Sequence, residues 1–420
     1  MSGEYRADVV VIGGGPSGLS AATALRRQGV GRVLVLERER EAGGIPRHSD
    51  HLGYGIRDRR RFISGPTYAR RLVSEATETG AEILTGTMAT SWRDERSLYL
   101  TSPRGREIVS ADAIIVATGA RERPRPARMI PGSRPAGVYT TGELQNRVHL
   151  HHGSVGKQAV IVGGELVSWS AAMTLKEAGC TPAAMVTRYD RPESYGVFNL
   201  GGRLLFRPAL VTGHRVTRVL GRRRVEGVEV EDLATGDRRV LDCDTVVFTG
   251  DWIPDHELVR SAGIELAPDT KGPLVDAAGR TRREGVFAAG NVVHPVDTAD
   301  IAALGGTHVA DAVLRYLGGT TAAAGGLRLL GDASFRWVSP GLIDLSAGVP
   351  ARGRIETWVD DLVRFPHVTV TQGDSVVTRR RLPWPASPGR VFRIPWDVLN
   401  GIAPTGGDVR LHLSQDKEHR

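Results

Sequence analysis

One short stretch near the start of the chain constrains the fold more than any other. The β-branched run Val9–Ile12 predicts a buried strand, and a glycine turn follows it directly. Residues 19–28 then predict a helix, and residues 32–36 predict a second strand. The turn has the spacing G-x-G-x-x-G, with glycines at Gly13, Gly15 and Gly18. A strand, this turn, a helix and a second strand in that order predict a dinucleotide-binding Rossmann unit.

Each glycine of this turn has a separate physical role. Gly13 permits the tight turn, Gly15 lets a pyrophosphate approach bare backbone, and Gly18 lets the helix pack closely on the strand. The helix N-terminus directs its free N–H groups at the phosphates. Glu37 ends the second strand, where its carboxylate can accept hydrogen bonds from an adenosine ribose. A purely structural turn would not require Glu37, so these residues together favour a bound dinucleotide.

Further strands continue the same unit. The next predicted strands are at residues 81–92, 97–101, 107–109 and 113–120. The last of them contains the sequence Ala117-Thr118-Gly119. Much later, residues 285–291 predict another buried strand, which ends at Gly290 and Asn291.

With these motifs the chain resembles the two-dinucleotide-binding-domain flavoproteins, the pyridine nucleotide–disulfide oxidoreductase superfamily, over about residues 6–320. The resemblance implies that FAD binds to the first glycine turn, the acidic strand end, the Ala-Thr-Gly strand and the final strand. The residues that it implies for FAD are Gly13, Gly15, Pro16, Ser17, Gly18, Glu37, Arg38, Gly43, Gly44, Ile45, Arg47, Ala117, Thr118, Gly119, Gly290, Asn291, Thr298 and Ala299.

An internal repeat supports a second unit of the same kind. Residues 159–164 repeat the first strand and its turn, and residues 245–250 repeat the Ala-Thr-Gly strand. We therefore expect an α/β fold with two Rossmann-like domains, the second inserted in the first, and a small C-terminal β domain. The expected limits are 1–125 and 285–324 for the FAD-binding domain, 126–284 for the NAD(P)-type domain and 325–420 for the β-rich domain.

The cysteines depart from the superfamily pattern. Where the redox cysteine pair of one variant would fall, this chain has Pro46 and His51, and the other variant's position, residues 138–143, also lacks cysteine. The chain's two cysteines, Cys180 and Cys243, are far apart in sequence. Thiol–disulfide chemistry is therefore excluded, as are a disulfide framework and an iron–sulfur site within the chain. No metal site is expected.

The second glycine turn is also altered. Laid on G-x-G-x-x-G, it reads Gly163, Glu165 and Ser168. A carboxylate at the second position would repel a diphosphate by about 4 kcal/mol at ~4 Å and an effective dielectric constant near 20. Binding of NAD(P) therefore stays open. Arg188, after the second strand of this unit, would suit either a 2′-phosphate or the solvent.

Asn291 stands where the superfamily has Asp. The amide oxygen of Asn can accept the ribityl hydrogen bond that the carboxylate usually accepts, so FAD binding should survive the change. Residues 297–301 predict the start of a helix whose N-terminus would face the flavin pyrimidine and stabilise a reduced anionic flavin.

Together the motifs around residues 43–48, 117–124 and 287–292 resemble a cysteine-less branch of the superfamily. That branch is similar to the alpha-type FAD subunits of sarcosine oxidase, opine oxidase and hydrogen cyanide synthase, and to flavoproteins that accompany anaerobic-type glycerol-3-phosphate dehydrogenase. The resemblance implies a dehydrogenase subunit in a hetero-oligomer, beside a second flavoprotein and a small iron–sulfur protein. It implies electron transfer between a small organic or nicotinamide donor and a partner redox centre. The alternative is a flavin-bound, catalytically silent subunit of such a complex.

The loop after Gly44 carries the candidate catalytic residues. His48 or His51 could take a proton from a substrate, while Arg47 or Arg57 orients a carboxylate or phosphate. The other interpretation is that these side chains bind FAD or line a surface between domains. The histidines at His149, His151 and His152 lack neighbouring carboxylates, which favours a loop over a metal site.

Charge and hydropathy exclude other classes of protein. The net charge is +8, but the basic residues are spread along the whole chain among 47 carboxylates, which disfavours a nucleic-acid partner. No charge-free apolar run is long enough for a transmembrane helix. Three glycines interrupt the apolar stretch near the N-terminus, so we expect no signal peptide and a cytoplasmic location.

The C-terminal part has a β pattern with turns. Four of the chain's seven tryptophans fall there, at Trp337, Trp358, Trp384 and Trp396. They would form either the core of the β domain or a docking surface for a partner.

Overall fold

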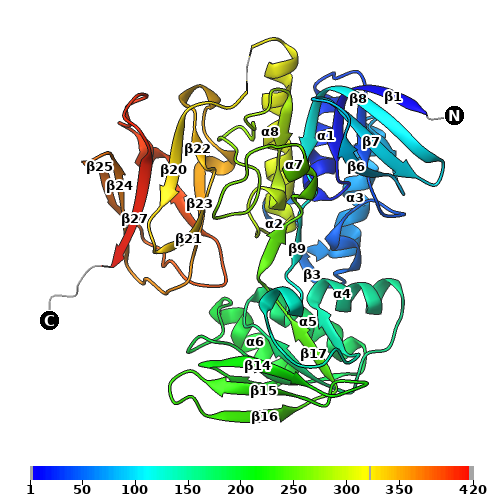
Figure 1. Cartoon of the computed structure of the whole chain (residues 1–420), viewed down its shortest axis with the longest axis vertical. Coiled ribbons are helices and arrows are strands. Elements are labelled where there is room, and N and C mark those ends of the chain that lie inside the picture. Colours follow the sequence, from blue (N-terminus) through cyan, green and yellow to red (C-terminus); the bar gives the residue numbers. More distant parts are fainter. Residues whose placement is uncertain (1–2, 321–322, 416–420) are drawn as a thin grey trace.

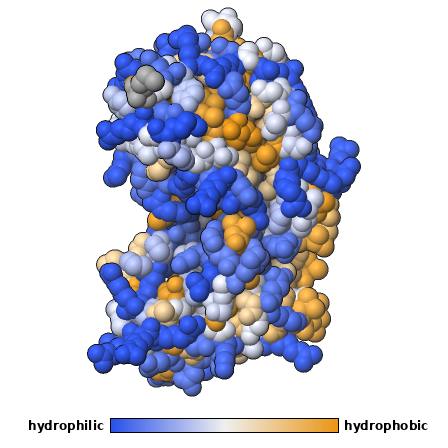
Figure 2. Space-filling model, turned by 90° about the vertical axis from the view of Figure 1, so that its right-hand side faces the viewer, coloured by the Kyte–Doolittle hydropathy of each residue, from blue (hydrophilic) through white to orange (hydrophobic). Residues whose placement is uncertain are grey.

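The computed structural model describes residues 3–320 and 323–415. Figure 1 shows a first unit in blue and cyan, a second unit in green below it, and two C-terminal sheets in orange and red at the left, with the long helix α8 (Ala299–Leu317) between the first unit and those sheets. Within the described residues, no helix combines the length and the apolar character that crossing a membrane requires. Figure 2 shows a face on which hydrophilic residues dominate and apolar residues gather in patches.

The first sheet is built around β1 (Glu4–Ile12), which pairs in parallel with β2 (Val33–Leu36) and β8 (Gly105–Val116). β5 (Glu82–Leu84) continues the sheet beyond β2, and β19 (Val286–Ala288) pairs in parallel with β8. Because β19 follows the second unit in sequence, that unit is an insertion in the first. This confirms the predicted α/β class and the nesting of the two Rossmann-like units.

An antiparallel arm extends the same sheet. It consists of β6 (Met88–Trp92) and β7 (Ser97–Ser102), which pairs with the first half of β8. The prediction of separate strands at 107–109 and 113–120 was wrong, because β8 is one strand that serves both the arm and the parallel sheet. Similarly, residues 81–92 form two strands, β5 and β6, instead of one.

The apolar residues of β1 divide between the two faces of the sheet. Val9 and Val11 pack with α1 (Pro16–Arg27), α3 (Gly65–Glu78) and α8. Val10 and Ile12 pack in a second cluster on the opposite face, which also contains apolar residues of the antiparallel arm. A strand that is buried on both faces explains the continuous β-branched run in the sequence.

The second unit has its own parallel sheet, in the order β10-β17-β11-β12-β13. Its strands are β10 (Val138–Thr140), β11 (Gln158–Val162), β12 (Thr181–Val186), β13 (Ala209–Val211) and β17 (Thr245–Phe248). An antiparallel sheet of β14 (His214–Leu220), β15 (Gly227–Asp232) and β16 (Arg238–Asp242) adjoins it in sequence. The main helices of this unit are α4 (Thr141–Gln145), α5 (Leu166–Glu177) and α6 (Gly196–Phe206).

The chain passes between the two units twice, through β9 (Ala120–Glu122) and β18 (Trp252–Pro254), which pair antiparallel. The remaining short elements of these units are β3 (Leu52–Tyr54), α2 (Ile56–Arg59), β4 (Ile63–Ser64) and α7 (Glu257–Ser261).

The C-terminal part consists of two β-sheets joined by loops and short 3₁₀ turns, as the predicted β domain required. One sheet has the order β22-β20-β27-β24-β25 and the other β21-β23-β26. The strands are β20 (Leu327–Gly331), β21 (Phe335–Ser339), β22 (Leu342–Ile343), β23 (Arg354–Val359), β24 (Pro366–Gln372), β25 (Ser375–Arg381), β26 (Phe392–Pro395) and β27 (Val409–Gln415). The predicted domain limits at 125, 284 and 324 stay predictions.

The four C-terminal tryptophans lie inside this part of the molecule. Trp337 and Trp358 are buried and stack on each other, with ring centroids 6.1 Å apart. Trp384 and Trp396 are partly buried against the apolar cluster between the sheets. Their placement favours the core interpretation over a docking surface.

We predict that Gly306→Ala destabilises the apoprotein by about 1–3 kcal/mol. A Cβ at Gly306 would lie 1.9 Å from the backbone oxygen of Ser17, where α8 packs on α1. Its neighbour Gly305 is the matched control, because the nearest atom to its Cβ outside its own helix would be the Gly290 nitrogen, 3.8 Å away. Gly305→Ala should leave stability unchanged or raise it slightly, since Ala favours a helix. Urea unfolding followed by circular dichroism measures both, and equal effects would contradict the prediction.

Candidate functional site

The first glycine turn packs so closely that side chains are excluded from two of its positions. Gly13 has φ +110°, and a Cβ there would lie 2.4 Å from the Ala117 oxygen. A Cβ on Gly18 would lie 2.0 Å from the Gly13 oxygen. Both residues therefore have to be glycine for β1, β8 and α1 to meet at this edge of the sheet.

Gly15 differs, because the space beside it is open. A Cβ there would meet only the Cα of Gly44, 3.9 Å away. Gly44 in turn has φ +63°, and the Gly43 N–H donates to the Gly14 oxygen at 2.7 Å. We call residues 13–18 with Gly43 and Gly44 the first cradle. Its bare backbone at Gly15 suits the close approach of a diphosphate.

Glu37 fixes the shape of this turn through hydrogen bonds to the backbone. Its carboxylate is buried and accepts hydrogen bonds from the N–H groups of Gly14 (3.0 Å) and Glu39 (2.8 Å). Burial raises the pKa of Glu37, and these two hydrogen bonds oppose the shift. Carboxylate oxygens have further lone pairs, so the group retains capacity for a ribose hydroxyl.

Two polar side chains beside the first cradle have buried atoms without a hydrogen-bond partner among the described residues. They are Ser17 Oγ and Asn291 Oδ1. Asn291 Nδ2 donates to the backbone oxygen of Asp297 at 3.0 Å, which leaves Asn291 Oδ1 free to accept a hydrogen bond. Unsatisfied buried polar atoms are rare in folded proteins. These two therefore fit a polar ligand such as the ribityl phosphate part of FAD.

The start of α8 lies beside this strand end. Thr298 is the N-cap residue, and Ala299 is the first helical residue. Arg57 reaches this end of the helix, where its backbone N–H donates to Asp300 Oδ2 at 3.0 Å and its guanidinium pairs with the same oxygen at 3.3 Å. Arg57 is thus committed to an ion pair and is less free to orient a substrate than the sequence indicated.

Other predicted cofactor residues contact Asp255, which directly follows β18. Thr118 Oγ1 donates to the Asp255 oxygen at 2.7 Å, and Asp255 N–H donates to the Gly119 oxygen at 2.9 Å. Arg38 pairs with Asp255 Oδ2 at 3.1 Å. The importance of Asp255 could not be recognised in the sequence, because it contacts these residues only after the chain has returned through β18.

The candidate catalytic residues lie in and just after a 3₁₀ turn at Ile45–His48. Arg47 pairs with Glu39 at 3.1 Å and also bonds the Glu41 backbone oxygen, so its guanidinium binds within the loop. His51 contacts Ser49 Oγ at 3.0 Å and the Leu52 oxygen at 2.9 Å. Ile45 itself is exposed.

The two histidines of this loop are neutral near pH 7. Burial lowers the pKa of His48 to about 4 and lowers the pKa of His51. His48 Nδ1 is buried without a hydrogen-bond partner among the described residues. His149, in a short π-helix of the second unit, contacts the His48 backbone oxygen through its Nδ1. His48 therefore lies at the interface of the two units, and its role in catalysis stays a prediction.

In the second unit, the altered turn is filled by a carboxylate. Glu165 Oε2 accepts hydrogen bonds from Ser168 Oγ (2.9 Å) and Thr249 Oγ1 (3.0 Å). Glu165 also covers Gly250, where a Cβ would lie 2.3 Å from Oε1. The carboxylate thus occupies the space between the turn and the end of β17. At the equivalent position of the first turn stands Gly15, which has no side chain.

A second carboxylate faces the same turn. A Cβ on Gly164 would lie 2.2 Å from Glu193 Oε2, and this oxygen accepts a hydrogen bond from Thr187 Oγ1 at 3.0 Å. Burial, and then the charge of Glu165, raise the pKa of Glu193 to about 8. We call residues 163–168 with Glu193 the second cradle. The raised pKa keeps Glu193 largely protonated at pH 7, so it adds bulk beside the turn and not a second full charge.

Sequence reasoning missed Glu193 because of its spacing. Glu37 comes directly after β2, whereas Glu193 lies several residues beyond the end of β12, on a loop that folds back. The residue at the strand end is Thr187, which carries no acidic signal. Arg188, named as a candidate for a 2′-phosphate, instead pairs with Asp360 of the C-terminal part at 3.0 Å.

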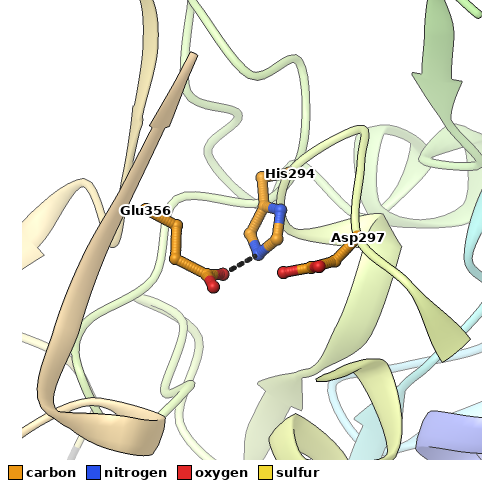
Figure 3. Close-up of side chains that lie close together, drawn as sticks. All are labelled: His294, Asp297 and Glu356. Carbon is orange, nitrogen blue, oxygen red and sulfur yellow. Dashed lines mark ion pairs between the residues drawn. The ribbon is translucent and has the colours of Figure 1, made fainter. Parts of the chain in front are cut away.

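A separate cluster of charged groups joins the first unit to the C-terminal sheets (Figure 3). His294 Nε2 pairs with Glu356 Oε2 at 3.0 Å, and Arg393 bonds both Asp297 (3.1 Å) and Glu356 (3.2 Å). Burial opposes ionisation of Glu356, but the hydrogen bond from His294 and the nearby cations lower its pKa.

The ligand atoms of His294, Asp297 and Glu356 lie within 4.8 Å of one another, as the ligands of a metal ion would. The guanidinium of Arg393 already bonds both carboxylates, and His294 Nδ1 contacts the Val296 oxygen at 2.9 Å. Arg393 and His294 thus bond the two carboxylates, while burial and the charge of Glu356 raise the pKa of Asp297. We interpret the cluster as an ion-pair network between the segment that precedes α8 and the sheet of β23 and β26.

Comparison with known proteins identifies the family to which these two nested units belong. The sequence profile of the family described as pyridine nucleotide-disulphide oxidoreductase matches residues 7–306. The biphenyl dioxygenase system ferredoxin–NAD(+) reductase component of Paraburkholderia xenovorans (strain LB400) is 31% identical over 301 residues, which cover 68% of this chain and 67% of that protein. An opine oxidase subunit of Rhizobium meliloti is 26% identical over 319 residues.

The match to the opine oxidase subunit covers 68% of this chain but only 58% of that protein, so the chain spans about three fifths of its length. Among solved structures, thioredoxin reductase of Lactococcus lactis aligns with a TM-score of 0.63 at 20% identity, over 74% of this chain and 99% of that one. This likeness shows the fold of the two nested units.

We predict that Glu165→Gly increases the affinity for NADH at least tenfold, because it removes both the bulk and the charge from the second cradle. Glu165→Gln is the matched control, since it removes the charge and keeps the bulk; its gain should be smaller. Isothermal titration calorimetry with the FAD-loaded protein measures both. Unchanged affinity in Glu165→Gly would show that the carboxylate does not limit binding.

We also predict that Glu193 makes the protein less stable as the pH rises. Its pKa of about 8 lies above that of an exposed glutamate, so between about pH 4.5 and pH 8 the folded state keeps a proton that the unfolded state has lost. The free energy of unfolding should therefore fall over this range. Glu193→Gln should gain stability relative to wild type between pH 5 and pH 8, by on the order of 2 kcal/mol.

Thermal and urea unfolding at several pH values test this effect. Glu284→Gln provides the control, because it makes the same substitution at an exposed position outside the second cradle. A difference between Glu193→Gln and wild type that does not change with pH would refute the prediction.

Proposed function

The chain belongs to the pyridine nucleotide-disulphide oxidoreductase family, whose members are FAD-dependent oxidoreductases, and from this premise we propose that it transfers electrons between a small donor and a partner redox centre through FAD bound in the first cradle. The observation that carries the proposal is the bare backbone at Gly15 beside the unsatisfied oxygens of Ser17 and Asn291. These features suit a diphosphate and a polyol and have no structural use of their own.

The residues proposed to hold FAD surround this cradle. Glu37 would bind the adenosine ribose, Asn291 Oδ1 would accept from a ribityl hydroxyl, and the backbone at Thr298 and Ala299 would face the pyrimidine end of the flavin. FAD, when bound, supplies two-electron redox chemistry. The chain has no cysteine pair for a redox disulfide, because Cys180 and Cys243 are buried free thiols.

The proton of the substrate would go to a neutral imidazole. His51 is closer to the loop surface than His48, whose side chain is 7% exposed. We therefore propose His51, whose Nε2 contacts Ser49 Oγ, as the first candidate for the base, and His48, whose Nδ1 has no hydrogen-bond partner among the described residues, as the second. Arg47, paired with Glu39, would hold this loop against the first cradle.

We further propose that the chain works as one subunit of a heteromeric dehydrogenase or oxidase. The similarity to the opine oxidase subunit supports this, and so does the similarity to a ferredoxin–NAD(+) reductase component of a dioxygenase system. The partners expected are a second flavoprotein and a small iron–sulfur protein. The iron–sulfur cluster would lie on the partner, because this chain has only two cysteines and a cluster is usually held by four. A cytoplasmic location stays a prediction.

The second candidate is a flavin-bound subunit without catalytic turnover. The carboxylate of Glu165 and the bulk of Glu193 in the second cradle favour it, because they obstruct the site where a nicotinamide donor would bind. The two candidates differ in whether any donor reduces the flavin.

Anaerobic visible spectroscopy of the FAD-loaded protein separates them. We expect the flavin band to persist with micromolar NADH or NADPH, and to bleach when an amine, an opine or a polyol phosphate is added with the partner subunits. Bleaching by NADH alone would make the chain a reductase in its own right. Persistence with every donor would favour the silent subunit.

Binding of FAD is tested separately with Gly15→Ala. The methyl group fits the apoprotein, so its unfolding should match wild type, but it would stand in the cradle and lower the affinity for FAD at least tenfold. If wild type takes up no FAD, or if Gly15→Ala binds it equally well, the first cradle is not the cofactor site.

A further inference from the structure

The helix α6 of the second unit exposes an unusual amount of apolar surface. Val197, Leu200, Leu204 and Leu205 are 73%, 63%, 67% and 65% exposed, and Phe198 is 49% exposed. Single exposed apolar residues are common, but a helix that presents five large ones together marks a surface that contacts something. We call these five residues the apolar stripe.

The stripe is not the result of a loosely placed helix, because the opposite side of α6 is tightly held. A Cβ on Gly202 would lie 2.2 Å from the ring of Trp169, so the backbone of α6 rests directly on that indole. The Trp169 N–H donates to Asn199 Oδ1 at 2.9 Å, and the Asn199 amide donates to the oxygens of Pro192 and Ser194. These contacts fix which face of the helix points outward.

Helical periodicity places the exposed residues on one face. Val197, Leu200 and Leu204 follow at intervals of three and four, and Leu205 lies seven residues after Phe198. Arg203 follows Leu200 by three residues and therefore borders the stripe along one side, and Arg207 is the C-cap residue at the end of the helix.

The border of the stripe is basic. Arg191, Arg203 and Arg207 are exposed and have no ion-pair partner among the residues that the structure describes. The guanidinium of Arg390 lies 5.0 Å above the ring of Tyr195, which precedes the helix. The exposed carboxylate closest in sequence to α6 is that of Asp190, six residues before the helix begins. An apolar face with a border of guanidinium groups suits an anionic counterpart.

We propose that α6 is a membrane-docking helix, which inserts the apolar stripe into the interfacial region of an anionic lipid bilayer while the bordering arginines bind lipid phosphates. A short amphipathic helix with arginines beside its apolar face has the composition of an interfacial anchor. The inference is independent of the proposed redox function, because the stripe shares no residue with the first cradle.

A second copy of this chain suits the surface less well. Self-association through α6 would bring the unpaired arginines of two copies into one interface, where like charges repel. The stripe stands outward on a helix. A lipid interface can adapt to such a convex shape, whereas a protein partner would require a matching groove.

Co-sedimentation with vesicles tests the proposal. The FAD-loaded protein should bind vesicles of equal parts phosphatidylglycerol and phosphatidylcholine, and bind pure phosphatidylcholine at least tenfold more weakly. The double variant Leu200→Glu/Leu204→Glu should lose binding at least tenfold. The double variant Arg203→Gln/Arg207→Gln should lose binding to the anionic vesicles without losing its fold.

The matched control lies on another part of the molecule. Leu345 is 58% exposed, and Leu345→Glu/Val349→Glu makes the same change of charge as the α6 variant without touching the stripe. It should bind anionic vesicles like wild type. This control separates insertion of α6 from general attraction of a chain with net charge +8 to anionic lipids.

A labelled cysteine reports insertion directly. Both natural cysteines are buried, so Leu204→Cys can be labelled selectively with an environment-sensitive fluorophore. Its emission should shift to shorter wavelength with anionic vesicles, whereas the same label on Leu345→Cys should not respond. This variant also keeps the test valid if the glutamate variants fail to fold.

Three results would overturn the proposal. Wild type that does not bind the anionic vesicles excludes a lipid surface, as does equal binding by the α6 and control variants. Sedimentation velocity from 5 to 100 µM gives the third: a dimer that only the α6 variant abolishes would assign the stripe to a second copy. In that case the label at position 204 would respond to protein concentration and not to lipid.

Discussion

The close approach of backbone to backbone at the carboxyl edge of the first sheet is the constraint on which the rest of the molecule depends. β1, β8 and α1 meet there with no space for a side chain at Gly13 or Gly18, while Gly15 leaves its space open. The tight packing at Gly13 and Gly18 fixes the turn, and the open space at Gly15 leaves room for a ligand. The Gly43–Gly44 segment lies beside that open position, with the Gly44 Cα 3.9 Å from where a Cβ on Gly15 would be.

The second unit has the same strand order around its turn but a different electrostatic environment. In the first cradle a single buried carboxylate, Glu37, has its charge stabilised by two backbone N–H groups. In the second cradle the carboxylate of Glu165 fills the turn and the buried Glu193 lies beside it, with a pKa that burial and the charge of Glu165 raise. Two turns of the same architecture therefore offer different surroundings to a dinucleotide, because affinity depends on the groups at the turn and not on the fold.

The third body of the molecule is connected to the first by charge. His294 and Asp297, which lie between the end of β19 and the start of α8, pair with Glu356 and Arg393 of the C-terminal sheets. His294 also stacks on the buried Trp337, with ring centroids 5.3 Å apart. The C-terminal sheets thus hold the segment that leads into α8. Breaking one partner of such a buried network would leave uncompensated charge.

The sequence by itself determined the nested Rossmann units, the family and most of the first cradle, because these depend on spacing along a short stretch of chain: glycines after a β-branched strand, Glu37 at the next strand end, and a matching strand far downstream. It also indicated the altered turn at Glu165. Only the tertiary structure decided that β8 is one continuous strand, that Glu193 folds back beside Glu165, that Arg57 and Arg188 are engaged in ion pairs, and that the C-terminal tryptophans are core. These features depend on contacts between segments far apart in sequence, and such contacts leave no local pattern from which a side chain's partner can be read.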